Sequence, residues 1–305
     1  MTLSLASITY SGIVLTADSR QTYRNVAGMT RIGTDNAVKL FELNRKAGVV
    51  VAGRAFFPDA KGAVKDVGWF IEDFRENVLK GQAWPIKQLA VELNEYLTKV
   101  FIEPEEARIA DFLTKQIQTD GGRDFIHTRT GSTIDYSFTD KDAQQVQRKF
   151  FIDTIGLIVA GYDADGVGHA YLVQVPNVST FERNTVFGGV LWIGQSEVVC
   201  RVILGYAGEL HELGFVKDAA ANAVNVQQEL EKLEYIINWG SMTLQDSIDI
   251  CVLLTKTTES IQRFSDGSNM HPGGITGVGG HINVATITPA DGFRWINKRD
   301  LVVSD

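Results

Sequence analysis

The sequence predicts an α+β protein in which two antiparallel sheets are flanked by helices. Strand-like segments gather at the start, in the middle and at the end of the 305-residue chain, and helix-like segments separate these groups. Short polar turns join the strands of the first group, as in β-hairpins. This order excludes the regular strand–helix alternation of a doubly wound parallel sheet.

The first hundred residues contain two predicted hairpins followed by two helices. Residues 3–10 and 13–17 form one strand pair, and residues 38–43 and 48–52 form the next. Apolar residues at helical spacing then predict two amphipathic helices: Val67, Phe70, Ile71 and Phe74 in the first, and Leu89, Leu93, Tyr96 and Leu97 after Pro85 in the second.

The rest of the chain alternates between a strand group, a helical region and a final strand pair. Strands are predicted at 156–162, 169–175, 189–193, 281–287 and 293–296. Helices are predicted at 196–213 and 243–264, with a further candidate between them. In that candidate, Val226, Leu230, Leu233 and Ile237 lie on one helical face, which is expected to pack on the core or on a neighbouring subunit.

Composition limits the classes of partner. The net charge is −8 and no run of lysine or arginine occurs, which argues against nucleic-acid and anionic-membrane binding. No apolar stretch reaches the ~20 residues of a membrane span, and the N-terminus lacks the pattern of a signal peptide. We therefore expect a cytoplasmic protein.

The sequence predicts neither a metal site nor a cofactor. Its two cysteines, Cys200 and Cys251, stand in apolar, helix-like stretches without metal-ligand spacing, and buried inert thiols are expected. The five histidines are scattered and show no zinc-helix pattern. The glycine-rich run 273–280 precedes a strand and lacks the Gly-Lys-Ser/Thr of a phosphate loop, so it is interpreted as a turn.

Thr2 is the first candidate for chemistry. Removal of Met1 would leave a hydroxyl and a free α-amine on one residue, so that residue can supply both nucleophile and base. A threonine hydroxyl must give up its proton during attack on a carbonyl. An α-amine, with a pKa of roughly 7.7–8.0, is partly neutral near pH 7 and can accept that proton.

Several motifs, taken in order and spacing, resemble the β subunits of the proteasome and the bacterial peptidase HslV, which are N-terminal-nucleophile (Ntn) hydrolases. They are GIVLTADSR (12–20), AVKLFELN (37–44), VAGRA (51–55), IVAGYDADGVGHAYLVQV (158–175), IGQSE (193–197) and GGHINVATIT (279–288). The resemblance implies a four-layer αββα sandwich. It also implies a single Ntn-hydrolase domain over residues 1–305, with insertions atypical of the family at about 103–152 and 214–241.

The resemblance further implies a threonine peptidase, active without a cofactor on peptides or unfolded proteins inside a homo-oligomeric chamber. An ATP-dependent unfoldase is a further partner of some relatives. The family's catalytic residues fall on Thr2, Asp18, Lys39 and Gly53. Its pocket for the substrate side chain falls on Gln21, Ala37, Phe41, Val51 and Ala55, a mostly apolar set that predicts a preference for apolar side chains.

These residue types suit acyl transfer. A cationic Lys39 near the α-amine would disfavour a second positive charge there, which would lower the pKa of the amine, and Asp18 would hold Lys39 charged and oriented. The N–H of Gly53 would stabilise the oxyanion of the tetrahedral intermediate, and the absence of a Cβ lets substrate approach closely.

The sequence departs from the family pattern at three supporting positions, where Gln195, Ile275 and Val278 replace groups that support the amine in many relatives. Two alternatives therefore stay open. One is a threonine-dependent transpeptidase, protein ligase or amidase, which would keep Thr2 and change the acceptor. The other is a non-catalytic structural subunit.

Overall fold

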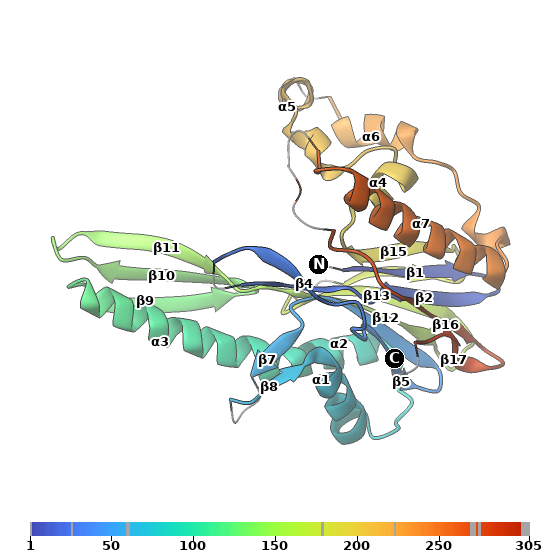
Figure 1. Ribbon diagram of the computed structural model, residues 1–305, viewed down its shortest axis with the longest axis horizontal. Coiled ribbons are helices and arrows are strands. Elements are labelled where there is room, and N and C mark those ends of the chain that lie inside the picture. Colours follow the sequence, from blue (N-terminus) through green and yellow to red (C-terminus); the bar gives the residue numbers. More distant parts are fainter. Residues whose placement is uncertain are drawn as a thin grey trace, which may run out of the picture.

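The computed structural model describes residues 2–25, 27–58, 62–177, 180–222, 224–268, 273 and 276–299. Two five-stranded antiparallel sheets form its body (Figure 1). The first has the order β15 (Gly189–Gly194), β1 (Leu3–Thr9), β2 (Gly12–Asp18), β16 (Ile282–Thr288) and β17 (Gly292–Asn297). The second has the order β14 (Thr180–Asn184), β13 (Gly168–Val175), β12 (Ile155–Tyr162), β6 (Ala47–Gly53) and β5 (Leu40–Asn44). The predicted α+β class with antiparallel sheets is confirmed.

The two sheets share an apolar core. Ile8, Ile13 and Leu15 of the first sheet belong to the same buried cluster as Val50 and Ile158 of the second. Strands β1, β2 and β12 are buried along their whole length. Strand β12 (IGLIVAGY) is apolar for nearly all of that length, as expected for a strand covered on both faces, whereas β1 and β2 also bury Ser4, Ser7, Thr9 and Thr16. Burial of this cluster fixes how the strand ends that carry the candidate site lie relative to one another.

Helices pack on the other faces of these sheets. The helices α1 (Val67–Asp73) and α2 (Ile86–Leu97), each followed by a π-helical turn (Phe74–Leu79 and Thr98–Ile102), pack against the second sheet. The helices α4 (Glu197–Ile203) and α7 (Leu244–Phe264) pack against the first. A capping box at Thr243 and Asp246 defines the start of α7.

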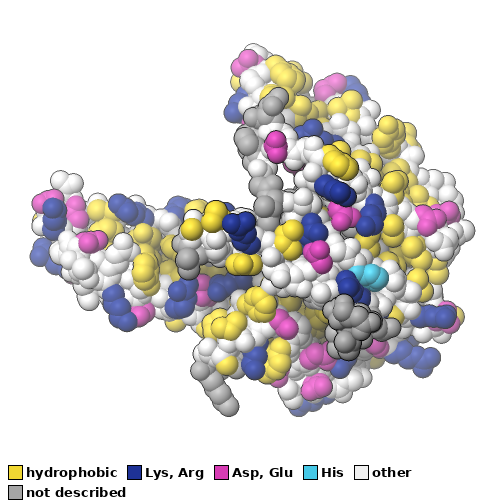
Figure 2. Space-filling model, viewed as in Figure 1, with side chains coloured by type: hydrophobic (Ala, Val, Ile, Leu, Met, Phe, Trp, Pro, Cys, Tyr) yellow, Lys and Arg dark blue, Asp and Glu magenta, His cyan; other side chains and the backbone are white. Residues whose placement is uncertain are grey.

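The first predicted insertion forms an arm that projects from the body (Figure 1). It consists of α3 (Glu103–Thr119) and a three-stranded sheet of β9 (Arg123–Thr130), β10 (Thr133–Thr139) and β11 (Gln145–Phe151). A proline and three glutamates in its first turn favour the start of α3. Ile109, Leu113 and Ile117 form its buried stripe. On the face drawn in Figure 2, basic and acidic side chains are interspersed over arm and body.

The described residues of the second predicted insertion form short helices joined by irregular segments. The helices are α5 (Gly214–Ala221), α6 (Val226–Leu230) and single 3₁₀ turns at Glu231–Leu233 and Trp239–Ser241. Two further strand pairs complete the described structure: β3 (Gln21–Arg24) with β4 (Thr30–Thr34), and β7 (Phe56–Pro58) with β8 (Val64–Asp66).

Two helix predictions are wrong in extent. The helix expected at 196–213 ends at Ile203, and a 3₁₀ turn follows at Gly208–Glu212. Gly205 lies between them with φ +81°, which a continuing helix does not permit. The single apolar stripe expected from Val226 to Ile237 is also wrong, because the chain becomes extended at Glu234 and Leu233 is 54% exposed.

Both cysteines lie in helices, Cys200 in α4 and Cys251 in α7, and both are free. Cys251 is fully buried, and burial raises its thiol pKa to about 12. Cys200 is only half-buried, so the expectation of two buried thiols holds for one of them. No helix in the described ranges combines the length and the apolar character needed to cross a bilayer.

Candidate functional site

Thr2 is held where β1 begins beside the end of β15. The N–H of Gln195 donates to the Thr2 carbonyl at 2.7 Å. Gly194 has φ +92°, and a Cβ at this residue would lie 1.9 Å from the Thr2 carbonyl oxygen. Only glycine permits so close an approach between the two backbones. The turn after β15 therefore fixes Thr2, which is 5% exposed.

Asp18 ends β2, on the strand paired with β1, and is fully buried. Its Oδ1 accepts from the N–H of Leu3 at 3.0 Å and from Lys39 Nζ at 2.9 Å. Its Oδ2 accepts from the N–H groups of Arg20 and Gly279, each at 3.1 Å. Because all four partners are donors, the ionised carboxylate is the form that can accept from every one of them.

Lys39 precedes β5, and its side chain reaches back to the end of β2. Besides Asp18, Nζ donates to the Arg20 carbonyl at 2.5 Å, and the side chain is 8% exposed. Burial lowers the pKa of Lys39 below that of an ordinary lysine, and its attraction to Asp18 opposes this shift. Burial raises the pKa of Asp18, against the effect of Lys39 and of its backbone donors. The pair is thus a desolvated ion pair linked by a direct hydrogen bond.

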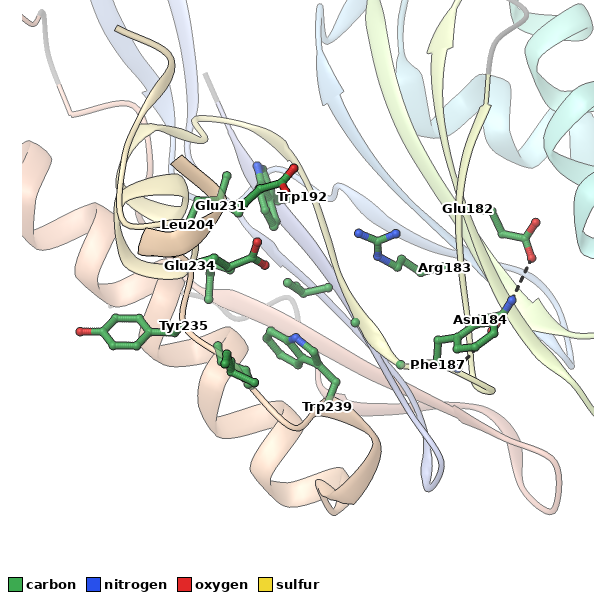
Figure 3. A pocket seen from close by; sticks show the side chains of 16 residues that line it. Glu182, Arg183, Asn184, Phe187, Trp192, Leu204, Glu231, Glu234, Tyr235 and Trp239 are labelled. Atoms are coloured by element: carbon green, nitrogen blue, oxygen red, sulfur yellow. Dashed lines mark hydrogen bonds between the residues drawn. The ribbon is translucent and has the colours of Figure 1, made fainter. Parts of the chain in front are cut away.

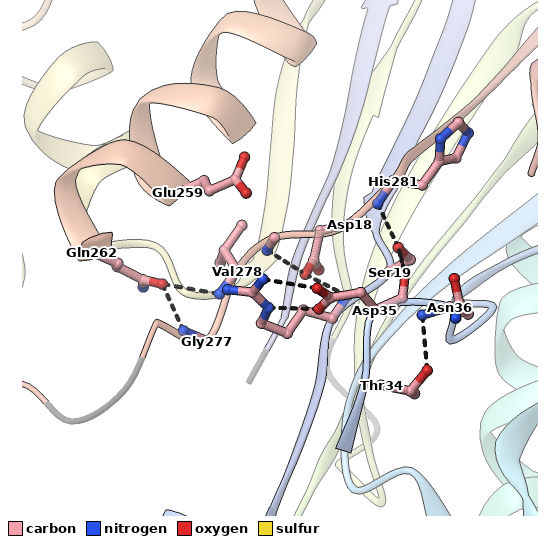
Figure 4. A network of polar contacts seen from close by, with 12 residues as sticks. Asp18, Ser19, Thr34, Asp35, Asn36, Glu259, Gln262, Gly277, Val278 and His281 are labelled. Carbon is pink, nitrogen blue, oxygen red and sulfur yellow. Dashed lines mark hydrogen bonds and ion pairs between the residues drawn. The ribbon is translucent and has the colours of Figure 1, made fainter. Parts of the chain in front are cut away.

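A second set of polar contacts surrounds this pair (Figure 4). Arg20 Nε and Nη2 donate to the two carboxylate oxygens of Asp35, at 2.7 and 3.0 Å. Arg20 holds the pKa of Asp35 below its ordinary value. Ser19 Oγ donates to the Asp35 carbonyl at 2.5 Å and accepts from the N–H of His281 at 2.7 Å. These contacts tie the end of β2 to residues 35 and 279–281.

Gly53 ends β6 with φ +116°, a conformation that favours glycine. A Cβ here would lie 2.5 Å from the carbonyl oxygen of Thr154. The next residue, Arg54, donates to the carboxylate of Glu105 at the start of α3, at 3.0 Å. The end of β6 is therefore connected directly to the base of the arm.

One cleft, with a volume of about 1470 Å³, brings nearly all the predicted site residues together. Its lining includes Thr2, Lys39, Gly53, Gln21, Ala37, Phe41, Val51 and Ala55. Asp18 is absent from this lining because it is buried and bonded to Lys39. Phe41 and Val51 are buried and give the cleft an apolar part. Charged residues line other parts: Arg24, Glu42, Arg54, Asp66, Glu72, Arg75, Asp153 and Lys298.

Three departures from the expected motif have different surroundings. Gln195 lines the cleft, and its side chain is bonded to Gln262 of α7 at 3.1 Å. Val278 is completely buried among apolar side chains. Ile275 lies outside the described residues. Sequence reasoning missed the contribution of Gln262, for which no motif gave a signal, and that of Arg20, which stands inside the Ala-Asp-Ser-Arg motif.

A second pocket of about 560 Å³ lies between β14, β15 and residues 231–239 (Figure 3). Trp192, Tyr235 and Trp239 line it together with Glu231 and Glu234. None of the predicted site residues belongs to it. Among the residues that the structure describes, no group of three or more His, Cys, Asp and Glu side chains is arranged to hold a metal ion.

Comparisons with known proteins assign the chain to no family. No family model and no curated protein matches the chain. Among similar solved structures, Anbu (ancestral beta-subunit) from Yersinia bercovieri is 12% identical with a TM-score of 0.48, over 98% of this chain and 88% of that one. Anbu from Hyphomicrobium sp. strain MC1 is 12% identical with a TM-score of 0.48, over 97% and 86%. A Gly-1 mutant of Anbu from the same strain is 12% identical with a TM-score of 0.46, over 98% and 86%.

These findings correct the family assignment made from the motifs. The chain was expected to belong with the proteasome β subunits and HslV, but no family model matches it, and the solved structures it resembles are Anbu proteins at 12% identity. The assignment is therefore wrong. The short motifs at strand ends reflect local backbone geometry, and they contain too few residues to define a family.

Proposed function

We propose that this protein is a hydrolase of peptide bonds whose nucleophile is the hydroxyl of Thr2, active once the bond before Thr2 has been cut. The observation that carries the proposal is the cleft, in which Thr2, Lys39 and Gly53 lie together above the buried Asp18. Nucleophile, cation and backbone donor come from three different strand regions, and their convergence in one cleft supports a chemical role.

In the proposed first step, Thr2 Oγ attacks the carbonyl carbon of the substrate and its proton passes to the α-amine of the same residue. Lys39 is held by Asp18 and by the Arg20 carbonyl and lines the same cleft as Thr2, so it would place a positive charge near that amine. The charge disfavours protonation of the amine before attack and favours the developing alkoxide. The C–N bond then breaks, the leaving amine takes the proton, and water cleaves the resulting ester.

Gly53 would donate its N–H to the oxyanion of the tetrahedral intermediate. Its φ of +116° and its contact with Thr154 exclude a side chain, so backbone and substrate can approach closely. Loss of one oxyanion donor typically lowers the rate by about 10²–10³-fold. This donor and the cation beside Thr2 are the two electrostatic elements of the proposed mechanism.

The cleft supports an extended peptide or an unfolded segment as substrate. Its volume of about 1470 Å³ exceeds the roughly 300–1,000 Å³ of common small-ligand pockets. We propose that Gln21, Ala37, Phe41, Val51 and Ala55 receive the side chain before the cut. Because Phe41 and Val51 are buried and apolar, we expect faster cleavage after apolar residues in a fluorogenic peptide panel. Cleavage only after acidic or basic residues would contradict this.

We propose four further properties of the protein, concerning its domain structure, location, assembly and cofactor requirement. The protein is a single domain, and its two sheets with helices packed outside them support a four-layer αββα sandwich. It is cytoplasmic. It works as a homo-oligomer that encloses the clefts, with an ATP-dependent unfoldase as a further partner. It requires no cofactor.

The decisive experiment is intact-mass analysis with and without a threonine-directed epoxyketone or β-lactone. We expect protein that begins at Thr2 to gain one probe mass, and Thr2→Ala to gain none while keeping its thermal stability. Thr2→Ser serves as the matched control, because it keeps a hydroxyl and an amine. Failure of correctly processed protein to react would contradict the proposal and favour a non-catalytic subunit. Formation of ligated product when a competing amine is added with the peptide would identify a transpeptidase.

A further inference from the structure

The side chain of Gln262, in the last turns of α7, is anchored by the turn before β16 (Figure 4). Its Oε1 accepts from the N–H groups of Gly277 and Val278, both at 2.9 Å. The backbone carbonyl of Gln262 also accepts from Thr276 Oγ1 at 3.2 Å. Because two backbone N–H groups can only donate, they fix which end of the Gln262 amide is the oxygen.

The other end of this amide faces the candidate site. Gln262 Nε2 donates to Oε1 of Gln195 at 3.1 Å. The backbone N–H of Gln195 in turn holds the Thr2 carbonyl at 2.7 Å. On the opposite side, Gly279 follows Val278 directly, and its N–H holds Asp18 at 3.1 Å. The Gln262 amide thus joins the segment that fixes Thr2 to the segment that fixes Asp18.

We propose that Gln262 is a positioning residue that keeps the Thr2 nucleophile in register with the Lys39–Asp18 pair. The inference rests on the proposed function, because it assigns Gln262 a part in that chemistry. Gln195 and Gln262 are half-buried and Val278 is buried, so water competes only partly for these hydrogen bonds. Gln262 does not line the cleft. It acts through Gln195 and the 276–279 turn.

The polarity of the network predicts which substitutions are tolerated. A glutamate at residue 262 can still accept from Gly277 and Val278, and the Gln195 amide can turn over to donate to it. A methionine has similar length but makes neither contact. Gln262→Glu should therefore keep the link and Gln262→Met should break it, although both retain the helix.

The test compares steady-state kinetics of the processed protein on one fluorogenic peptide. Gln262→Met should lower kcat by about tenfold or more with KM changed by less than about twofold, because the reacting groups are misaligned while the cleft is intact. Gln262→Glu should stay within about threefold of the unchanged protein. Gln245→Met is the matched control, since Gln245 is exposed at the other end of α7 and bonds only to Asp249 in the described structure.

Gln195→Met cuts the same hydrogen bond from the cleft side and keeps the test valid if Gln262→Met does not fold. The double variant should be no slower than the slower single variant, because both substitutions remove one shared interaction. The proposal would be overturned if the rate losses of the two single variants added in the double variant. It would also be overturned if Gln262→Glu and Gln262→Met lost equal rates, or if the loss appeared in KM and not in kcat.

Hydrogen–deuterium exchange of Gly277 and Val278 separates this inference from the proposed function. These amides should exchange about tenfold faster in Gln262→Met than in Gln262→Glu, since only the latter keeps their acceptor. Equal exchange would overturn the positioning role whether or not Thr2 reacts. If the exchange difference is present but Thr2 does not react with the epoxyketone or β-lactone, the result counts against the proposed function and still supports the structural link through Gln262.

Discussion

Asp18→Asn is the sharpest perturbation of the Lys39–Asp18 pair, because it removes the charge and keeps the shape. Asp18 is fully buried and accepts from four N–H groups, two on each oxygen. An asparagine can accept at one oxygen only, and its NH₂ group would face two donors. Two hydrogen bonds are therefore lost, and the buried Lys39 ammonium loses its counter-charge.

Breaking a buried ion pair from one side typically costs about 3–5 kcal/mol. With an unfolding entropy of about 2.1 cal/mol/K per residue, this loss lowers Tm by about 5–8 °C in a chain of 305 residues. Differential scanning calorimetry at pH 7 measures the shift. Lys39→Met leaves the buried carboxylate with its three backbone donors but without its counter-charge, and should destabilise the fold by a similar amount.

The double variant Asp18→Asn/Lys39→Met tests the reasoning itself. If the two side chains stabilise each other, the double variant should be more stable than the sum of the single losses predicts, by about 2 kcal/mol or more. Additivity within about 0.5 kcal/mol would show that the two groups do not interact in the folded protein. A shift below about 1 °C for Asp18→Asn alone would refute the estimate as well.

Four further substitutions, one of them a control, test other parts of the structure. Gly53→Ala, whose Cβ would lie 2.5 Å from a backbone oxygen, should lower Tm and slow probe labelling by about 10²-fold. Gly194→Ala, with a Cβ 1.9 Å from a backbone oxygen, should do the same. Gly208→Ala is the control and should change neither, because a Cβ there meets nothing within 4 Å outside its own turn; equal effects at all three glycines would be inconsistent with the geometry. Hydrogen bonds from two arginines, first Arg108 and then Arg54, lower the pKa of Glu105 below its ordinary value of 4.5. The stability that these contacts contribute is therefore present above pH 4.5 and is lost as the pH falls. Glu105→Gln should therefore lower stability by about 1 kcal/mol or less at pH 7 and by a smaller amount at pH 3, and an equal loss at both would disprove the linkage.

The sequence located the cleft residues because the hairpins that carry them are local. Residues 3–10 and 13–17 were expected as one hairpin, and the observed pairing of β1 with β2 brings the start of one strand beside the end of the other. That register alone places the N–H of Leu3 at Asp18. The pairing of β5 with β6 likewise brings Lys39 to the end of β6, because the N–H of Val51, two residues before Gly53, donates to the Lys39 carbonyl. Short-range register therefore positions most of the candidate site.

The arm and the helix ends could not be predicted in the same way. Strand β11 has almost no buried residue, so its sequence carries no alternation that would identify a strand. The break after α4 depends on Gly205, where a Cβ would lie 2.6 Å from the carbonyl oxygen of Leu233. Such contacts between distant segments leave no periodic signal. They appear only once the chain has folded.

The contacts that hold the site together explain why sequence reading found some members and missed others. Asp18 receives three of its four hydrogen bonds from backbone N–H groups, and Gln262 receives both of its own from the backbone. Nearly any residue can supply a backbone N–H donor, so the residues that donate to Asp18 and Gln262 need no characteristic side chain. The acceptors and the cation must be specific residue types, and a motif reveals them only where they lie close together in sequence. Asp18 and Lys39 satisfy that condition; Gln262, whose partners come from two other segments, does not.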